Sequence, residues 1–160
     1  MGWKAAVATG LVLVATVAVV RTQLVHVVSV SSDSMAPTVC TGGYVLIKKL
    51  HADSPVAVHD IVTLPSPQDG QTVVKRVVGT AGSTVAIEDA ELVVDGRKVD
   101  EPYVDHDTID GVYYGPVTVP ERSVLVMGDN REVSIDSRTF GPVATSDLQG
   151  RVVWVIRRNC

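Results

Sequence analysis

The apolar residues of this chain follow two patterns, and the first is one long run near the amino terminus. Residues 5–20 (AAVATGLVLVATVAVV) carry no charge and lie between Lys4 and Arg21. A membrane-spanning helix needs about 17 to 25 apolar residues, so the run is marginal unless Trp3 and the positions beyond Arg21 extend it. A cleaved secretory signal is the alternative, but the run lacks the small-x-small ending of a cleavage site. We therefore predict a retained membrane anchor at residues 1–22.

The second pattern covers residues 23–160, where short valine-rich runs alternate with polar or glycine-containing segments. Valine favours strands, and runs of this length are typical of strands. Asp95-Gly96 lies between two such runs and predicts a tight hairpin turn. Because no long segment in this region has the period of a helix, we predict a mainly β domain. The predicted strands are residues 23–30, 44–47, 72–78, 113–120, 123–127 and 151–158.

Size and charge limit the classes of function. The chain has 160 residues and a mass of 17.0 kDa, which is enough for one domain with a hydrophobic core. Its net charge of −4 argues against nucleic acid as a partner, because phosphate binding requires a basic surface.

The residues that most often bind metals do not form a recognisable site. Cys40 and Cys160 are too few for a disulfide framework and lack a metal-ligand spacing. A disulfide between them requires Cα atoms within about 7 Å. The sequence does not reveal this distance, so two free thiols are the default expectation. The polar segment HADSPVAVHD holds a second candidate set, but no tight ligand pattern recurs elsewhere, and we predict a solvated loop without metal. That set is His51, Asp53, His59 and Asp60.

Two segments carry candidate chemistry. Residues 32–38 (SDSMAPT) present two hydroxyls just before a proline, which restricts the backbone to an extended or turning loop and can expose Ser34 as a nucleophile. Taken alone, this is also ordinary turn chemistry. Lys75 lies between Val73 and Val77 on one face of a predicted strand; it could extend to solvent at a sheet edge, or it could be buried. Burial lowers a lysine pKa, and a neutral amine is a competent base for a serine hydroxyl.

A third segment, residues 128–143, is dense in polar and charged groups and follows a predicted buried strand. Asp136 and Arg138 are two residues apart, so in an extended backbone they share a face with Ser134. Charged donors and acceptors at this spacing form short hydrogen bonds. A polar loop held together by its own side chains is the alternative interpretation.

These three segments together resemble bacterial type I signal peptidases. The matching stretches are SDSMAPT at residues 32–38, KRVVG at residues 75–79 and GDNRxxSxDSR at residues 128–138. Their order behind a single amino-terminal apolar run makes the resemblance specific. Shorter stretches at residues 42–48, 140–143 and 150–152 are also similar to the family.

The resemblance implies a role for each matching residue. Ser34 resembles the nucleophile and Lys75 its general base. Ser32 resembles the oxyanion-hole hydroxyl, and Ser134 the hydroxyl that orients the lysine amine. Two ion pairs resemble structural supports, and valines near the matching segments are candidates for the substrate pocket. The pairs are Asp136 with Arg138 and Asp129 with Arg76, and the valines are Val28, Val30, Val39, Val73 and Val74.

The resemblance also implies a fold and some local differences. The family fold is an antiparallel β architecture with coiled barrels, which here would comprise residues 23–160 with a minimal accessory hairpin region around residues 84–120. This chain has Gly42-Gly43 where the family usually has Gly-Asp, and Ala81-Gly82-Ser83 where the family has Pro-Gly-Asp. Both differences leave the local loop and ion pairing open.

The implied function is a membrane-anchored serine endopeptidase that removes signal peptides from exported preproteins. The implied substrates have small residues at the first and third positions before the cut, and no metal or cofactor is needed because the amine is the base. The resemblance places the enzyme in the plasma membrane as a single-pass protein, with its catalytic domain on the extracytoplasmic side. Three alternatives remain: a mitochondrial inner-membrane or single-substrate peptidase of the same mechanism, a self-cleaving repressor, and an inactive peptide-binding β module tethered to a membrane.

Overall fold

The computed structural model describes Val7, Thr9, Gly10 and residues 25–51, 53–106, 113–156 and 160. Most of the predicted anchor at residues 1–22 lies outside the described residues, and no helix within them is long and apolar enough to cross a membrane. The fold is mainly β, which confirms the prediction from the valine-rich runs. The elements are β1 (Val25–Ser29), β2 (Tyr44–Lys49), β3 (Ile61–Pro65), β4 (Thr72–Thr80), β5 (Thr84–Glu88), β6 (Glu91–Val94), β7 (Arg97–Lys98), β8 (Tyr114–Thr118), β9 (Ser123–Met127), α2 (Ser137–Phe140), β10 (Val143–Ala144), η2 (Thr145–Asp147) and β11 (Gly150–Ile156).

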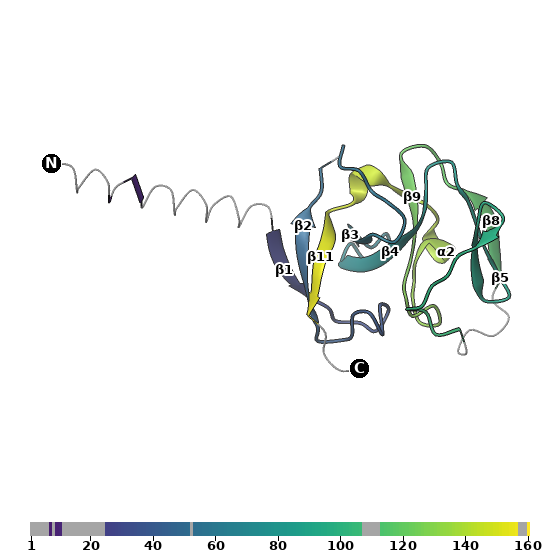
Figure 1. Cartoon of the computed structure of the whole chain (residues 1–160), viewed down its shortest axis with the longest axis horizontal. Helices are drawn as coiled ribbons and strands as arrows, with labels where there is room; N and C mark the ends of the chain where they lie inside the picture. The colour runs from purple at the N-terminus through teal and green to yellow at the C-terminus, as the bar shows by residue number, and fades with distance from the viewer. Residues whose placement is uncertain (1–6, 8, 11–24, 52, 107–112, 157–159) are drawn as a thin grey trace.

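The strands form two sheets. The larger sheet is a curled antiparallel half-barrel with the strand order β1-β2-β11-β3-β4-β9-β10, and the smaller sheet has the order β7-β6-β5-β8. In Figure 1, β1, β2 and β11 lie side by side toward one end of the domain, while β5 and β8 lie at the opposite end. The strand β4 pairs with β3 on one side and with β9 on the other, so it is an interior strand.

Strand β4 joins the three main clusters of the core. Val77 belongs to the cluster with Val62 and Leu64 of β3, while Val78 belongs to the cluster that includes the buried residues of β5. Val74 belongs to a third cluster, which packs beneath the loop that carries Ser34. The two cations of this strand, Lys75 and Arg76, are therefore buried among core residues, where an unpaired charge is costly.

The local predictions largely agree with the structure. The Asp95-Gly96 turn connects β6 and β7, and both of its residues have positive φ, at 51° and 74°. This backbone conformation suits glycine and aspartate and matches a tight hairpin turn. The one-turn helix α2 was not predicted, because its stability comes from a local cap: the Asp136 side chain accepts a hydrogen bond from the Arg138 main-chain N–H.

The expectation of two free thiols is wrong. Cys40 and Cys160 form a disulfide, with their Cα atoms 5.8 Å apart. Strand β11 pairs with β2 so that Ile156 lies opposite Tyr44, which carries the chain back toward the loop that contains Cys40. The sequence could not show this proximity, because 120 residues separate the two cysteines.

The two departures from the family pattern have local structural reasons. A Cβ atom at Gly43 would lie 2.9 Å from the Cys40 carbonyl oxygen, so the backbone passes too close for a side chain. Ser83 closes the turn between β4 and β5: its hydroxyl donates to the Thr80 carbonyl at 2.6 Å and accepts from the Thr80 N–H at 3.0 Å. Each local loop is thus suited to the residue present.

Candidate active site

Ser34 lies on a loop that hydrogen bonds hold closed at its base. The Val30 N–H donates to the Gly43 carbonyl at 2.9 Å, and the Gly42 N–H donates to the Val30 carbonyl at 2.7 Å. Next to Ser34, Met35 is fully buried in the core cluster that also contains Val30. The buried methionine anchors the loop from below and leaves the serine hydroxyl at the surface of the cleft.

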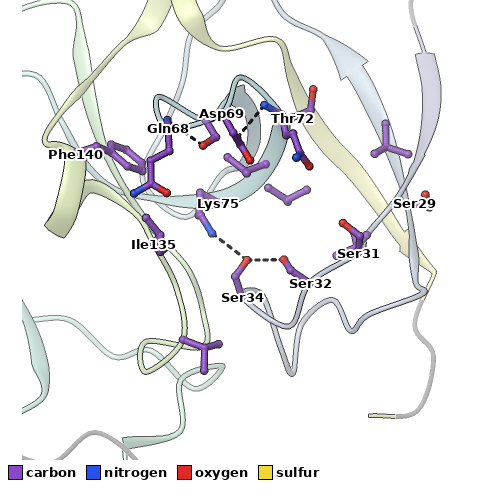
Figure 2. A pocket seen from close by; sticks show the side chains of 17 residues that line it. Ser29, Ser31, Ser32, Ser34, Gln68, Asp69, Thr72, Lys75, Ile135 and Phe140 are labelled. Atoms are coloured by element: carbon purple, nitrogen blue, oxygen red, sulfur yellow. Dashed lines mark hydrogen bonds between the residues drawn. The ribbon is translucent and has the colours of Figure 1, made fainter.

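The structure brings Lys75 to this serine. The Lys75 Nζ atom donates a hydrogen bond to Ser34 Oγ at 2.9 Å, although 41 residues separate the two (Figure 2). An inactive peptide-binding module would require these two side chains to lie far apart, and they are in direct contact. Ser32 Oγ lies 3.3 Å from Ser34 Oγ, also within hydrogen-bonding distance. Hydrogen bonds therefore connect the two hydroxyls and the amine in a row, with Ser34 in the middle.

The environment of Lys75 favours the neutral amine. The residue is only 2% exposed, and burial lowers its pKa, partly opposed by the negative charge of Asp136. None of the ion pairs among the described residues includes Lys75. Because a buried ammonium without a carboxylate in contact is costly, the amine gives up its proton more easily than a solvated lysine.

Asp136, which is buried, forms an ion pair with the partly exposed Arg138, and both charges act on Lys75. The Arg138 side chain donates to both carboxylate oxygens of Asp136 at 2.9 Å, and the Gly128 N–H also donates to this carboxylate at 3.0 Å. Burial alone would raise the pKa of Asp136, but the bonds and charge of Arg138 outweigh burial and hold that pKa below its usual value. Arg138 also donates to the carbonyls of Arg131 and Ser134, which fixes the shape of the segment.

Ser134 lies close to this pair, and its side chain helps to hold the pKa of Asp136 below its usual value. Its Oγ atom is buried, and within the described residues it makes no hydrogen bond to Lys75. Gly128 packs against it so tightly that a Cβ atom at Gly128 would collide with Ser134 Oγ and with the Ser34 carbonyl oxygen. The glycine therefore allows this segment to approach the Ser34 loop.

The second cation of β4, Arg76, is fully paired. It donates to the two carboxylate oxygens of Asp129 at 2.8 and 2.6 Å, and its guanidinium lies 3.8 Å from the centre of the Tyr103 ring. The Tyr103 hydroxyl donates to Glu101, and Glu101 also accepts a hydrogen bond from Arg131 at 2.7 Å. This buried network connects β4 to residues 101–103 and 129–131.

Sequence reasoning missed the two residues that complete this network. Glu101 and Tyr103 lie in the predicted accessory region, and nothing in their local sequence indicates that they face Arg76 and Arg131. Arg131 was quoted within the GDNR stretch, but no role was assigned to it. Its position two residues after Asp129 was the available signal.

A cavity of about 260 Å³ opens beside Ser34 and Lys75 (Figure 2). Four of the five predicted pocket valines line it: Val28, Val30, Val73 and Val74. Val39 does not, because its side chain is fully buried in the core cluster beneath the loop. The sequence reasoning missed the opposite wall, where Figure 2 shows Ile135 and Phe140, and the polar end, where it shows Gln68, Asp69 and Thr72.

No group of three or more metal-ligating side chains occurs among the described residues. The candidate set in the polar segment is engaged differently: the Asp60 carboxylate pairs with Arg151 at 3.0 Å, and the His59 ring lies 3.2 Å from the Tyr103 hydroxyl. The chemistry that this site offers is that of a serine hydroxyl next to a buried amine.

Comparisons with known proteins agree with the motifs and the geometry. The family described as signal peptidase, peptidase S26 matches residues 3–157. Signal peptidase I of Bacillus caldolyticus is 34% identical over 154 residues, which cover 88% of this chain and 84% of that protein. Signal peptidase I V of Bacillus subtilis is 34% identical over 134 residues, which cover 76% of this chain and 79% of that protein.

A solved structure agrees with the same assignment. The crystal structure of a signal peptidase I from Enterococcus faecalis matches with a TM-score of 0.56 and 31% sequence identity, over 62% of this chain and 98% of that chain. The family match covers nearly the whole sequence, and the two relatives match over most of their own length. The chain therefore belongs to the signal peptidase I, peptidase S26 family.

Proposed function

We propose that this chain is a serine endopeptidase that cleaves amino-terminal signal peptides from exported proteins, with Ser34 as nucleophile and Lys75 as general base. The observation that carries the proposal is the 2.9 Å contact between Ser34 Oγ and a lysine amine that is buried without a carboxylate partner. Such an amine is neutral more often than a solvated one, and only the neutral form can accept the serine proton.

The reaction begins when Ser34 transfers its hydroxyl proton to Lys75 Nζ and its Oγ attacks the scissile carbonyl carbon. The tetrahedral intermediate then collapses, the C–N bond breaks, and the lysine ammonium returns the proton to the leaving amine. A water molecule repeats the two steps on the acyl-enzyme and regenerates both side chains. One amine thus acts first as base and then as acid.

The neighbouring hydroxyls support these steps. Ser32 Oγ, 3.3 Å from Ser34 Oγ, is positioned to donate to the oxyanion together with the Ser34 main-chain N–H. Ser134, whose hydroxyl is buried close to the Asp136 carboxylate, is the candidate to orient the lysine amine. The pairs Asp136 with Arg138 and Arg76 with Asp129 hold the surrounding backbone.

The cavity beside Ser34 suits an extended peptide. Strand β4 and the segment that follows β1 border it, so a substrate can add as a strand, with main-chain hydrogen bonds for affinity and shallow pockets for selection. Val28, Val30, Val73 and Val74 provide an apolar lining for the small residues at the first and third positions before the cut. Neither a metal nor a cofactor takes part.

The family is typically membrane-bound, and we extend the proposal to the amino-terminal run. Residues 1–22 would anchor the enzyme as a single-pass plasma-membrane protein, and residues 23–160 would act on the extracytoplasmic side. The apolar run at residues 5–20 supports this assignment. Membrane lipid is then a partner, and the net charge of −4 argues against nucleic acid.

The test is cleavage of a preprotein with an Ala-x-Ala junction by the full chain in detergent. Ser34→Ala and Lys75→Ala should each abolish product formation, whereas Ser146→Ala, an exposed serine outside the cavity, should retain normal cleavage. Ser32→Ala should lower kcat by about 10²- to 10³-fold, because one oxyanion donor is lost.

Full activity in either Ser34→Ala or Lys75→Ala would overturn the assignment of the nucleophile or the base. Circular dichroism of each variant checks that a loss of activity does not come from a loss of fold. Mass spectrometry of the product identifies the bond that was cut.

A further inference from the structure

The segment that follows β7 in the smaller sheet carries a buried glutamate, Glu101. The Val104 N–H donates to the Glu101 carbonyl at 2.9 Å, and Val104 is buried in a small cluster with Ala90, which lies between β5 and β6. The main chain around Glu101 is therefore fixed to the smaller sheet. Its carboxylate contacts a different segment, the one that follows β9 and contains Arg131.

Arg131 connects this glutamate to the backbone beside Ser34. Its Nη2 atom donates to Glu101 Oε1 at 2.7 Å, and its Nε atom donates to the Gly128 carbonyl at 3.0 Å. One planar guanidinium can make both bonds at once because its N–H groups have a fixed arrangement. The position of the Gly128 carbonyl therefore depends on where Glu101 holds the guanidinium.

The backbone of residues 128–130 in turn contacts the residue that carries the nucleophile. The Asn130 N–H donates to the Ser34 carbonyl at 3.1 Å, and a Cβ atom added at Gly128 would lie only 2.4 Å from the same oxygen. A displacement of this backbone would therefore move the main chain of Ser34, and with it the hydroxyl next to Lys75. A misplacement of about 1 Å can lower the rate of an enzyme by about 10²-fold.

Burial makes the link between Glu101 and Arg131 strong. The two side chains are 0% and 1% exposed. Removal of one partner from a buried ion pair leaves an uncompensated charge, which costs far more than the loss of a surface pair. Without the carboxylate, the guanidinium would move toward water and release the Gly128 carbonyl.

We propose that Glu101 is a positioning residue for Ser34, which acts through Arg131 and the backbone of residues 128–130. The inference rests on the proposed function and adds to it a residue from outside the segments that resemble the family. Glu101, Arg131 and Gly128 do not line the cavity beside Ser34. Glu101 therefore controls the rate of the chemical step and not the binding of substrate.

The experiment measures kcat and KM per folded molecule for the full chain in detergent, with a preprotein that carries an Ala-x-Ala junction. Arg131→Lys keeps a cation for Glu101 but loses the forked donor, so kcat should fall by about 10- to 10²-fold with little change in KM. Glu101→Gln should also lower kcat. The control Tyr103→Phe removes the hydrogen bond that Tyr103 donates to the same carboxylate but keeps the ion pair, so it should retain the kcat of the parent chain.

A double variant separates positioning from stability. Glu101→Leu combined with Arg131→Met replaces the pair by apolar side chains of similar size, so the fold should remain as stable as the parent in urea denaturation. Its kcat should stay low, because the Gly128 carbonyl has lost its donor. The parent kcat in the double variant or in Arg131→Lys would show that the pair only stabilises the fold, and would overturn the inference.

Hydrogen exchange makes the test independent of catalysis. The Asn130 amide, which donates to the Ser34 carbonyl, reports the contact between the two segments. In Arg131→Lys and in the double variant it should exchange faster, relative to a core amide, than in the parent chain, and Tyr103→Phe should match the parent. Unchanged exchange in Arg131→Lys would overturn the inference whether or not the chain cleaves the preprotein. Absence of cleavage by the parent chain would instead count against the proposed function.

Discussion

Lys75 and Arg76 are adjacent on β4, and both are buried cations, yet the protein treats them in opposite ways. Arg76 faces Asp129, which accepts two hydrogen bonds from it, and the Tyr103 ring. Lys75 donates to the uncharged hydroxyl of Ser34 and takes part in no ion pair among the described residues. Alternation along the strand points the two side chains to opposite faces of the sheet, so one residue step separates two electrostatic environments.

The pKa values of the two groups shift in opposite directions. Burial lowers the pKa of Lys75, and the nearby Asp136 only partly offsets this. Burial also acts to lower the pKa of Arg76, but the hydrogen bonds and charge of Asp129 outweigh it, and the pKa rises. A buried charge with a partner serves the structure, whereas a buried amine without one is available for chemistry.

The largest expected effect that tests this comparison is that of Lys75→Met. We expect kcat/KM to fall by about 10²- to 10⁴-fold, because the general base is removed. The free energy of unfolding should stay the same or rise, because methionine fills a similar volume and leaves no buried carboxylate unpaired. Peptide cleavage and urea denaturation measure the two quantities. A large loss of stability would show that Lys75 has a structural role similar to that of Arg76.

Arg76→Met should have the opposite effects, a large loss of stability and a small loss of activity. Its free energy of unfolding should fall by about 3–5 kcal/mol, because Asp129 is left buried and unpaired. Urea denaturation measures the loss, and kcat per folded molecule should fall much less than in Lys75→Met.

A double variant separates pairing from packing in that result. Arg76→Met combined with Asp129→Leu should recover part of the lost stability, with a coupling energy of about 0.5–3 kcal/mol. Simple additivity of the two single losses would show that Arg76 stabilises the fold through its ring contact and packing instead of its ion pair.

The pH dependence tests the lysine side of the comparison. The neutral fraction of Lys75 increases as pH rises through its lowered pKa, so log(kcat/KM) should rise with pH and level off below the ordinary value of 10.5. The free energy of unfolding should also increase with pH. Between the lowered pKa and 10.5 the unfolded chain holds the extra proton, so stability increases with pH in that window.

Two measurements check these signs. One is the pH profile of kcat/KM, and the other is the difference in unfolding free energy between the parent chain and Lys75→Met as a function of pH. That difference should change in favour of the parent chain as the pH rises. A flat kinetic profile from pH 5 to 9 would count against a lysine base.

The smallest expected effect is that of the partly exposed pair between Arg151 and Asp60. Its side chains are 31% and 19% exposed, so water screens their interaction. Arg151→Met should lower the free energy of unfolding by about 0.2–1 kcal/mol, far less than Arg76→Met. Urea denaturation in low and high salt measures it. A loss as large as that of Arg76→Met would mean that burial does not control the contribution of these pairs.

Much of the architecture was predictable because strands depend on short-range patterns. The valine-rich runs predicted β1, β2, β4, β8, β9 and β11, and Asp95-Gly96 predicted its turn. The helix α2 was missed because a single side-chain cap stabilises it, and η2 and β10 are too short for their pattern to be read. The predicted hairpin implies β6 and β7 on either side of its turn, whereas strands β3 and β5 were not predicted.

The sequence indicated which residues could form the site, but it did not indicate how far apart their side chains lie. Ser32, Ser34 and Lys75 were selected from their local sequence and from the family resemblance. Val39 shows the limit of such reasoning, since it is close to the nucleophile in sequence but lies in the core beneath the loop. Glu101 and Tyr103 show the converse case. They are far from the matching segments in sequence, yet Glu101 pairs with Arg131 and the Tyr103 ring contacts Arg76.

The sequence by itself determined most of the strands, the family resemblance and the residue types that carry the candidate chemistry, because each depends on neighbours within a few positions. The tertiary structure alone decided that Lys75 reaches Ser34 across 41 residues, that Cys40 bonds to Cys160 across 120, and that Glu101 pairs with Arg131 across 30. Such contacts follow from strand order, register and core packing, which involve the whole chain at once. A local pattern cannot encode them.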